Sequence, residues 1–547
     1  MYRINLNRKA QLTVSVLAAF FLSYIPLSAQ NIRTMNVVGR SVKAVQGEIL
    51  VKFAAGGAPS SESLSALSAY GASASGRIRG IEVFRYSVPD GELEKILEEL
   101  NARPDILYAE PNSVYYAQAL PPVYNTVIEL EAAQWGLAKI QAPGAWDIET
   151  GNSKAIIAVV DSGVDLSHTD LAANIWVNTG ETSSGLDSDG NGYIDDINGW
   201  DFVDGDNDPN PDVAEEWHGT HVAGISSASG SNGAAGLAYG SSIMALKVLS
   251  YRNVDGSMTV SGDTADIAEG IIYAADNGAL IINMSLGADA PNSVLENAIK
   301  YASNAGVILV GASGNANDTI VYWPAAYAEV IAVGASDKSD NRADFGGGAG
   351  SNYGSALELM APGVDIRSTM PGGGYANSQG TSMAAPFVSG LAALAVSYYE
   401  EKNQSWDGEM IRDLLIRHAD GLSGGGYPYR DSETGYGRIN AQTMMTFIDA
   451  GGFRVDPSEP LSYPNPFNPE LQTLMLVLSS GNTSEVREYK IFSLSGRLVR
   501  NDSGLSGTFA RWDGRNNDGS LCAPGLYFYQ LSTYGGDNER GKITLVR

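Results

Sequence analysis

The chain has 547 residues, which is too long for one ordinary hydrophobic core, so we expect two or more domains together with segments that are removed by processing. Its 62 acidic and 35 basic residues give a formal net charge of −27, which disfavours nucleic acid or an anionic membrane surface as a partner. Cys522 is the only cysteine, so no disulfide can form within the chain. Bound metal would then be the obvious source of extra stability outside the cell.

The N-terminus has the three parts of a secretory signal. Basic residues precede an apolar run at 12–27, and the small pair Ser28-Ala29 follows it. We therefore expect residues 1–29 to be a signal peptide and the protein to be secreted, to the medium or to the cell surface. An uncleaved membrane anchor is the alternative, but polar residues and a proline interrupt an apolar run that is short for a stable span.

Residues 45–116 have the pattern of a small α+β unit. Its expected elements are strands at 48–53, at 80–88 and near 106–108, and a helix at 92–100. Residues 117–134 contain Pro121-Pro122 and show no clear period, so we expect an exposed linker. Proteolytic processing would naturally fall in such a segment.

Residues 135–449 alternate short apolar strands with helices, which predicts an α/β fold with a doubly wound, mostly parallel sheet. Strands are expected at 155–160, 243–249, 279–284, 306–310 and 330–333. The helices expected at 266–277 and 293–305 are each followed by a glycine, Gly278 or Gly306, which suits the left-handed position after a helix.

The last part of the chain begins with a linker at 450–462 that leads into a proline-rich entry. From 463 to 547 the residues alternate between strand and turn patterns, for example at 495–496 and 517–519. We expect a small all-β sandwich here.

Two polar residues follow expected strands of the central domain. Asp161 comes directly after the most apolar strand, so its carboxylate would lie at the carboxyl end of a parallel strand, where such sheets carry their active sites. Asn315 ends the stretch Gly311-Ala-Ser-Gly-Asn315, and its amide could donate to a reacting oxygen. An aspartate that caps the next turn and an ordinary turn asparagine are the alternatives.

Two further residues lie at expected helix starts. His218 opens the stretch His218-Gly-Thr-His-Val-Ala-Gly224, and a zinc site with His221 is disfavoured because no acidic residue completes an HEXXH pattern. Ser382 lies in Gly380-Thr-Ser-Met-Ala-Ala-Pro386, before a long apolar helix. Free N–H groups at that position can stabilise an oxyanion, although a merely helix-capping serine is the alternative.

Together Val159-Val-Asp-Ser-Gly-Val-Asp165 and the stretches that begin at His218 and Gly380, in the order Asp, His, Ser within one α/β domain, resemble the signature blocks of the subtilisin-like serine proteases, or subtilases. The resemblance implies a secreted serine endopeptidase that works through an acyl-enzyme. Ser382 would be the nucleophile, His218 the base and Asp161 the residue that orients the imidazolium. Asn315 and the Ser382 backbone N–H would form the oxyanion hole, and His221 would be the family's second, non-catalytic histidine.

The resemblance also implies substrate-binding segments, an inhibitor and a sorting signal. The segments that would flank the first specificity pocket are Ser285, Leu286 and Gly287, and Ala312, Ser313 and Gly314. Their small side chains suggest a broad, apolar-leaning preference for protein or peptide substrates. Residues 45–116 resemble an inhibitory propeptide, so we expect a zymogen that cuts itself between 116 and 134 and acts as a monomer. The tail resembles the sorting domains of type IX secretion and implies that secretion machinery is a partner; an immunoglobulin-like accessory domain is the alternative.

Residues 187–216 contain nine Asp, two Glu and no Lys or Arg, a density of like charge that favours bound calcium. The candidate ligands are Asp187, Asp189, Asn191 and Asp195, which follow the spacing of an EF-hand-like loop that lacks its final Glu, then Asp201, Asp204, Asp206 and Asp208, which resemble a loop of thermitase-like subtilases. Asp170 matches the aspartate of the family's strong calcium site. A solvated acidic loop without an ion is the alternative.

Two rival functions follow from the same sequence. A surface protein that keeps the fold without activity predicts a broken triad or oxyanion residue, and each of these residues is present. An esterase predicts a Gly-x-Ser-x-Gly elbow, but Gly380-Thr-Ser-Met-Ala surrounds Ser382.

Overall fold

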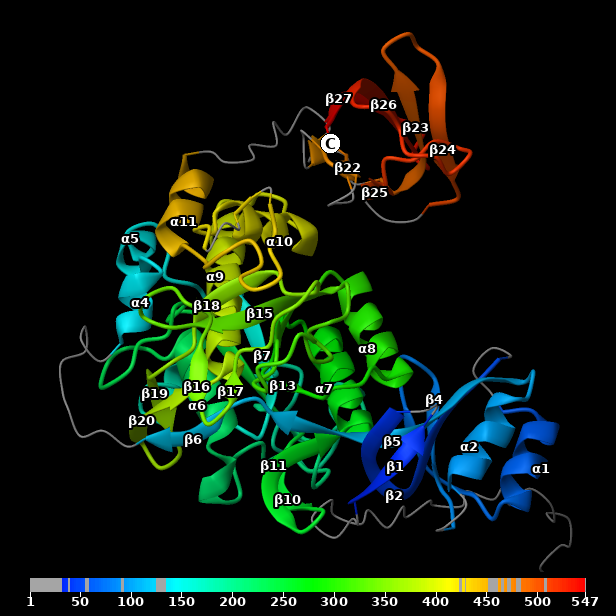
Figure 1. The fold of residues 1–547 in the computed structure, drawn as a ribbon, viewed down its shortest axis with the longest axis vertical. Helices are drawn as coiled ribbons and strands as arrows, with labels where there is room; N and C mark the ends of the chain where they lie inside the picture. The colour runs from blue at the N-terminus through cyan, green and yellow to red at the C-terminus, as the bar shows by residue number, and fades with distance from the viewer. Residues whose placement is uncertain are drawn as a thin grey trace, which may run out of the picture.

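The structure is a computed structural model. It describes residues 32–37, 40–54, 59–89, 93–123, 134–422, 426–427, 429–450, 461–463, 467–469, 474–478, 484–505 and 509–546. The signal peptide expected at 1–29 lies outside these residues, as do 124–133 and most of the linker expected at 450–462. Figure 1 shows an N-terminal domain (residues 32–117), a larger central domain (134–450) and a C-terminal domain (461–546).

The N-terminal domain is an antiparallel sheet with two helices. Its elements are β1 (Ile32–Val37), β2 (Arg40–Phe53), α1 (Ser61–Ala69), β3 (Ser73–Ile78), β4 (Val83–Ser87), α2 (Leu93–Asn101) and β5 (Ile106–Ala117), with β5, β2, β4 and β3 side by side in that order. Leu93, Ile96, Leu97 and Leu100 recur at helical spacing and bury one face of α2. The sequence predicted α2 and the strands around β2, β4 and β5. It did not predict α1, whose serine- and alanine-rich sequence has few large apolar residues to mark a period.

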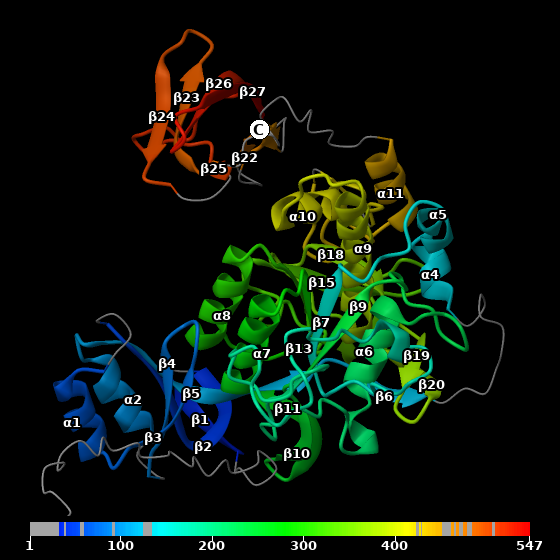
Figure 2. The same ribbon diagram turned by 180° about the vertical axis from the view of Figure 1, so that it is seen from behind.

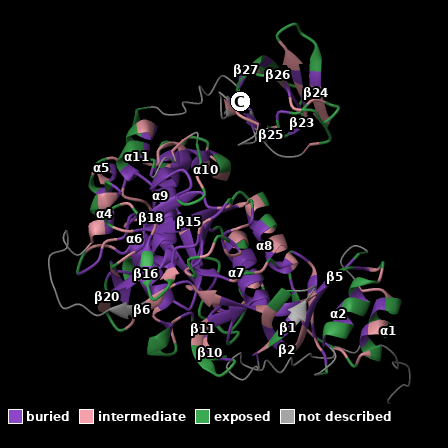
Figure 3. Ribbon diagram, in the orientation of Figure 1, coloured by how far each residue is buried: buried purple, intermediate pink, exposed green. Residues whose placement is uncertain are grey.

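The central domain is built on a 7-stranded parallel sheet, as its alternating pattern predicted. The strand order is β18 (Leu359–Pro362), β15 (Val330–Ser336), β14 (Ile308–Ala312), β12 (Ile281–Met284), β7 (Ile156–Asp161), β9 (Ser242–Lys247) and β8 (Gly199–Asp201). The strands are buried almost throughout, which Figure 3 shows as the purple centre of the domain.

Helices cover both faces of this sheet. α6 (His218–Ser227) and α9 (Thr381–Glu401) pack in one hydrophobic cluster, and α7 (Thr264–Asp276) and α8 (Ser293–Asn304) pack in the other. Gly278 and Gly306 follow α7 and α8 with φ of +82° and +89°, so both glycines adopt the predicted left-handed conformation. Among the described residues α9 alone has the length and hydropathy of a membrane span, and its apolar 18-residue window is fully buried in the domain core.

Shorter elements complete the central domain. They are α4 (Trp135–Lys139), α5 (Ala142–Trp146), α10 (Gly408–Arg417) and α11 (Ala441–Asp449), the hairpin of β10 (Ser250–Val254) and β11 (Ser257–Asp263), and the strands β13 (Leu286–Gly287), β16 (Asp344–Gly346), β17 (Ala349–Gly350), β19 (Ile366–Met370) and β20 (Gly374–Gln379).

The C-terminal domain is all-β, as predicted. One sheet contains β21 (Leu461–Tyr463), β22 (Leu474–Val477) and β25 (Phe509–Trp512), and the other contains β24 (Leu498–Ser503), β23 (Val486–Ser493), β26 (Gly525–Thr533) and β27 (Asn538–Leu545). Phe467, Trp512 and Tyr529 are buried in the core between them, and Cys522 is buried there as well.

Residues 117–123 differ from the exposed linker that their composition predicts. β5 runs out of the N-terminal domain and pairs with β11 and β13 of the central domain, and β6 (Leu120–Val123) pairs with β20 (Figures 1 and 2). Pro121 and Pro122 in β6 break the alternating apolar pattern of a central strand. Proline is nevertheless compatible with the extended backbone of an edge strand. The chain therefore crosses the central domain in extended form instead of leaving it.

Candidate active site

Asp161 and His218 meet at the carboxyl end of the parallel sheet. Asp161 is the last residue of β7, and His218 is the first residue of α6. The Nδ1–H of His218 donates to Oδ1 of Asp161 over 2.7 Å, and both side chains are buried. Because Nδ1 carries the proton of this bond, Nε2 of the neutral ring is free to accept one, and it has no hydrogen-bond partner within the described part of the chain.

Ser382 lies at the N-terminus of α9, one residue after the helix begins. Its backbone N–H donates to the carbonyl oxygen of Gln118 over 3.0 Å. Its hydroxyl donates to the carbonyl of Ser285 over 2.8 Å, so the side chain must rotate about its Cα–Cβ bond before it can donate to Nε2 of His218. The position suits a nucleophile because the helix N-terminus stabilises the negative charge that develops on the oxygen of the carbonyl group under attack.

Asn315 and Gly380 complete the space around the Gln118 carbonyl. Oδ1 of Asn315 accepts from the backbone N–H of Thr381 at 2.9 Å, so its Nδ2 faces the other way. A Cβ atom added to Gly380 would lie 2.5 Å from the Gln118 oxygen and 3.0 Å from Nδ2 of Asn315. One small space thus contains the Gln118 oxygen, Nδ2 of Asn315 and the position that a Cβ of residue 380 would occupy. Only a glycine at 380 leaves this space open.

The segment through the cleft is held by backbone hydrogen bonds on both sides of Gln118. Ala117 pairs with Leu286 and Tyr116 pairs with Gly287, while the N–H of Gln118 donates to the carbonyl of Ser285 over 3.1 Å. Beyond Gln118, Leu120 pairs with Gln379, and the Ser378 hydroxyl donates to the carbonyl of Leu120 over 2.9 Å. This is the path of an extended peptide bound along an active-site cleft.

The Gln118 side chain fills a pocket, and its residue is only 7% exposed. Its Nε2 donates to the carbonyls of Tyr116, at 3.0 Å, and Gly287, at 3.2 Å. Ser285, Leu286 and Gly287 thus lie where the sequence expected a substrate-binding segment.

The second expected segment contacts the start of α9 and Tyr322. The Gly314 N–H donates to the Thr381 hydroxyl over 3.1 Å, and the Ser313 carbonyl accepts from the N–H of Tyr322. Ala312 ends β14 and is buried. No hydrogen bond joins these three residues to 116–118 among the described contacts, so their part in substrate binding stays a prediction.

His221 lies one turn further along α6 and is buried. Its Nε2 lies 3.2 Å from the carbonyl oxygen of Ala376, and since a carbonyl can only accept, Nε2 carries the proton. Burial lowers the pKa of His221 to about 3, so the ring is neutral and unsuited to proton transfer near neutral pH. The expectation that this histidine is non-catalytic agrees with that placement.

The N-terminal domain contacts the starts of two helices of the central domain. Glu110 accepts from the N–H and the hydroxyl of Ser293, at 2.8 and 2.7 Å, at the first residue of α8. Oδ1 of Asn112 accepts from the N–H of Ala265 in the first turn of α7, over 3.1 Å. Glu110 satisfies the first N–H of α8, and Asn112 shares the Ala265 N–H with the helix-capping Asp263; sequence reasoning did not identify Glu110 or Asn112.

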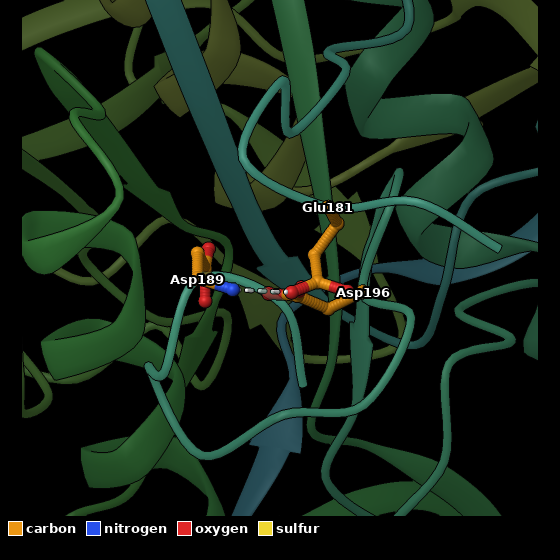
Figure 4. Close-up of side chains that lie close together, drawn as sticks. All are labelled: Glu181, Asp189 and Asp196. Atoms are coloured by element: carbon orange, nitrogen blue, oxygen red, sulfur yellow. Dashed lines mark hydrogen bonds between the residues drawn. The ribbon is translucent and has the colours of Figure 1, made fainter. Parts of the chain in front are cut away.

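Three carboxylates of the acidic stretch converge in the loop before β8 (Figure 4). Glu181, Asp189 and Asp196 place one oxygen each within 4.8 Å of one another. Glu181 is 7% exposed; its Oε1 accepts from the N–H groups of Ser188 and Asp189, but its Oε2 is buried with no described partner. Burial raises the pKa of Asp196, and the charge of Asp189 adds to that effect. Glu181 and Asp196 were not among the predicted ligands.

The other predicted ligands of that loop point elsewhere. Asp187 accepts from the N–H groups of Gly190 and Gly192, and Asp195 accepts from those of Ser184 and Gly185. The Asn191 side chain donates to Asp189 and Asp196, so its amide supports the cluster without pointing an oxygen into it. Of these four predicted residues, Asp189 alone lies in the cluster, because the carboxylates of Asp187 and Asp195 turn toward backbone N–H groups.

A second cluster joins Asp201, Asp204 and Asp212, but a cation of the chain itself lies beside it. The Lys247 side chain, which is 0% exposed, places Nζ 3.0 Å from Asp201 and 3.5 Å from Glu216, and it contacts Asp212. Burial raises the pKa of Asp201 to about 6, against the opposing charge of Lys247. The predicted ligands Asp206 and Asp208 are exposed on the same loop and accept from neighbouring N–H groups.

Asp170 accepts hydrogen bonds from the loop at 232–234. Its carboxylate accepts from the N–H groups of Asn232 and Gly233, each at 2.9 Å, from that of Ala234 at 3.2 Å, and from the hydroxyl of Tyr375 at 2.7 Å. Hydrogen-bond donors thus surround the oxygens that the family resemblance assigned to calcium.

Comparison with known proteins agrees with this geometry. A model of the subtilase family matches residues 152–437, which contain Asp161, His218, Asn315 and Ser382. The chain belongs to the subtilase family. A second model, the fervidolysin N-terminal prodomain, matches residues 33–112, so the N-terminal domain of this subtilase is a prodomain.

The subtilase is similar to several characterised serine proteinases. It is 37% identical over 422 residues to a thermophilic serine proteinase of Bacillus sp. (strain AK1), covering 77% of this chain and 92% of the relative. It is 40% identical to thermitase of Thermoactinomyces vulgaris, covering 57% and 96%, and 37% identical to subtilisin Savinase of Lederbergia lenta, covering 53% and 93%. The chain is a subtilisin-like serine endopeptidase made with its prodomain as an intramolecular inhibitor.

Proposed function

We propose that this subtilase hydrolyses peptide bonds with Ser382 as the nucleophile and His218 as the base. Asp161 orients the His218 ring, and Asn315 donates to the oxyanion. The observation that supports this most directly is the Gln118 carbonyl, which accepts from the Ser382 N–H beside Asn315, while Asp161 holds the His218 ring by a hydrogen bond. A peptide carbonyl held there is polarised by the same donors that would stabilise the oxyanion formed from it.

The chemistry follows from these contacts. After rotation of its side chain, Ser382 attacks the bound carbonyl carbon while Nε2 of His218 takes its proton. Asp161, bonded to Nδ1, stabilises the imidazolium. The Ser382 N–H and Nδ2 of Asn315 donate to the oxyanion, His218 returns the proton to the leaving amine, and water then hydrolyses the ester.

For substrates we propose a broad preference with apolar side chains accepted at the first pocket. The support is the small residues along Ser285–Gly287 and Ala312–Gly314 and the backbone pairing of residues 116–118 with the first of these segments. Such pairing recognises any extended chain, because it uses main-chain groups that every peptide has.

A casein assay tests the activity. The mature protein should hydrolyse casein, and a serine-directed phosphonate should abolish hydrolysis. The Ser382→Ala variant is the matched control for contaminating protease. If the wild-type protein cleaves no more casein than this variant, peptide hydrolysis by Ser382 is ruled out and the inactive surface protein becomes the better account. Cleavage of acyl esters without casein would favour the esterase.

We also propose that Glu181, Asp189 and Asp196 hold a structural calcium ion. The fit is good because calcium prefers oxygen ligands, three carboxylates converge, and Oε2 of the buried Glu181 has no described partner. When bound, the ion would neutralise charges that otherwise repel one another. The cluster at Asp201 fits an added ion less well, since Lys247 already supplies the positive charge.

Thermal melting of the Ser382→Ala precursor, with calcium and with a chelator, tests this proposal without a role for activity. Saturating calcium at about 100 times its dissociation constant would add about 2.7 kcal/mol to the stability of the unit that binds it. Glu181→Gln should abolish that shift, and Asp187→Asn should retain it. The reverse pattern would support the EF-hand-like ligand set instead, and no shift in the parent would refute calcium binding.

Export is a further proposal, and its support comes from the sequence. We propose that residues 1–29 are a cleaved signal, that the protein is secreted as a monomer, and that residues 463–547 address it to the type IX machinery. Deletion of 463–547 should then retain the protein inside cells that possess this machinery. Unchanged export of the truncated protein would favour the accessory-domain alternative.

A further inference from the structure

We propose that the precursor cuts itself at the bond between Gln118 and Ala119, and that the first specificity pocket recognises the glutamine through its side-chain amide. The inference rests on the proposed peptide hydrolysis by Ser382. It reduces the expected processing region of 18 residues, 117–134, to one bond and adds a preference to the pocket.

The position of one carbonyl selects the bond. The Gln118 oxygen accepts from the Ser382 N–H at 3.0 Å and lies on the side of Gly380 that Nδ2 of Asn315 faces. Ala119 follows directly, with its Cα 2.9 Å from a Cβ built on Gly380. The reacting carbon and its leaving nitrogen thus both lie at the site where an oxyanion would be stabilised.

Neighbouring carbonyls are held elsewhere. The Tyr116 oxygen accepts from the Gln118 side chain, and the Leu120 oxygen accepts from the Ser378 hydroxyl. The strand pairs on either side, Ala117 with Leu286 and Leu120 with Gln379, prevent the segment from slipping by one residue without breaking both ladders. The register therefore leaves Gln118 as the residue whose carbonyl faces the nucleophile.

The pocket recognises the Gln118 side chain as a hydrogen-bond donor. Nε2 of Gln118 donates to the Gly287 carbonyl of the pocket and to the Tyr116 carbonyl of its own segment, and a carboxylate would have no proton to donate to either oxygen. A glutamate at 118 would place a buried negative charge against two carbonyl oxygens. A methionine has similar length and no charge, so it fills the pocket at the loss of two modest hydrogen bonds.

The step balances with groups that are present in the chain. The Ser382 oxygen forms an ester with the Gln118 carbonyl carbon, and the Gln118–Ala119 C–N bond breaks. The serine proton passes through His218 to the Ala119 amine, which becomes the new N-terminus. Water then cleaves the ester, leaves a carboxylate on Gln118 and restores the Ser382 hydroxyl.

Mass spectrometry at the earliest time of maturation tests the bond. The full-length precursor should yield a prodomain fragment that ends at Gln118 and a catalytic fragment that begins at Ala119, while Ser382→Ala yields neither. A first cut at any other bond, in protein that hydrolyses casein, overturns this inference and leaves the proposed function intact. Absence of casein hydrolysis overturns the proposed function itself, so the two failures are distinguishable.

Maturation rates test the pocket. We expect the order wild type, Gln118→Met, Gln118→Glu, with the glutamate variant at least about 10-fold slower than the methionine variant. Gln141→Glu is the matched control, because Gln141 is exposed and lies outside the cleft, and it should mature at the wild-type rate. Equal rates for the two Gln118 variants would overturn recognition of the amide.

Discussion

Arg85 in β4 of the prodomain donates to Oδ1 of Asp266 in α7 of the catalytic domain over 2.9 Å. The same guanidinium lies 3.7 Å from Asp263 and 3.9 Å from Glu48, and its side chain is 12% exposed. One buried cation of the inhibitor therefore faces two buried carboxylates of the enzyme, in addition to the helix contacts of Glu110 and Asn112.

Removal of Arg85 should loosen the precursor. In the Ser382→Ala background, Arg85→Met leaves Asp263 and Asp266 buried without this cation, and breaking such a buried pair costs about 3–5 kcal/mol. The measurement is the free energy of unfolding in urea. Arg77→Met is the matched control, since Arg77 pairs with Glu82 at the surface, where a pair contributes about 1 kcal/mol or less. Equal losses in the two variants would show that the buried contact is no stronger than the exposed one.

The stability of the precursor should depend on the ionisation of Glu269. Burial raises its pKa to about 7, partly offset by Arg85 and Arg79 and reinforced by Asp263, whereas an unfolded glutamate titrates near 4.3. The folded state thus binds the proton more tightly, so this stabilisation is complete below about pH 4 and is lost as the pH rises to about 7.

Glu269→Gln should remove that dependence. In the Ser382→Ala background we expect the variant to melt at a higher temperature than its parent at pH 8 and at nearly the same temperature at pH 4.5. Glu98→Gln, at an exposed position of α2, should change neither value. A Glu269→Gln curve parallel to that of the parent would contradict the prediction.

Gly380 should not tolerate a side chain. Its φ is +147°, and a Cβ would lie 2.5 Å from the Gln118 oxygen, so Gly380→Ala should block the oxyanion space. Loss of the donors there reduces turnover by about 10²–10³, as it does for the oxyanion asparagine of a subtilisin. Casein hydrolysis and maturation should fall at least that far. Gly374→Ala, whose Cβ would meet only the Met370 Cβ at 3.7 Å, should keep both, and an active Gly380→Ala enzyme would refute this account.

Lys247 should act in place of an ion at the second acidic cluster. Lys247→Met leaves Asp201 and Glu216 buried without a cation, so we expect a loss of about 3–5 kcal/mol in the absence of calcium. Added calcium should restore part of the melting temperature, beyond the shift that calcium produces in the parent. A variant that responds to calcium only as the parent does would show that the carboxylates cannot use an ion.

The sequence was most informative at strand ends and helix starts, where apolar periodicity defines the position and the residue type suits a chemical role. Asp161, His218 and Ser382 lie at a strand end and two helix starts, and periodicity alone locates those positions. The same holds for Gly278 and Gly306, because a left-handed residue after a helix depends only on its own backbone. The parallel sheet followed from apolar runs that are buried on both faces.

The acidic loop at 181–196 shows what such reasoning does not decide. The spacing of Asp187, Asn191 and Asp195 resembles a known loop, but spacing does not decide whether a carboxylate turns toward an ion or toward a backbone N–H. Glu181 lies outside the motif and enters the cluster only through the fold of the loop. Lys247, distant in sequence on β9, could not be matched to Asp201 without the sheet that joins them.

The sequence by itself thus indicated the fold class and the family and predicted the catalytic residues, because these depend on short motifs and on the period of apolar residues. Only the tertiary structure decided which bond lies on Ser382, since residues 117–123 have no period and gain their extended form from strands more than a hundred residues away. Pairing between distant segments exists only in the folded chain. This pairing sets the register that places the Gln118 carbonyl against Ser382.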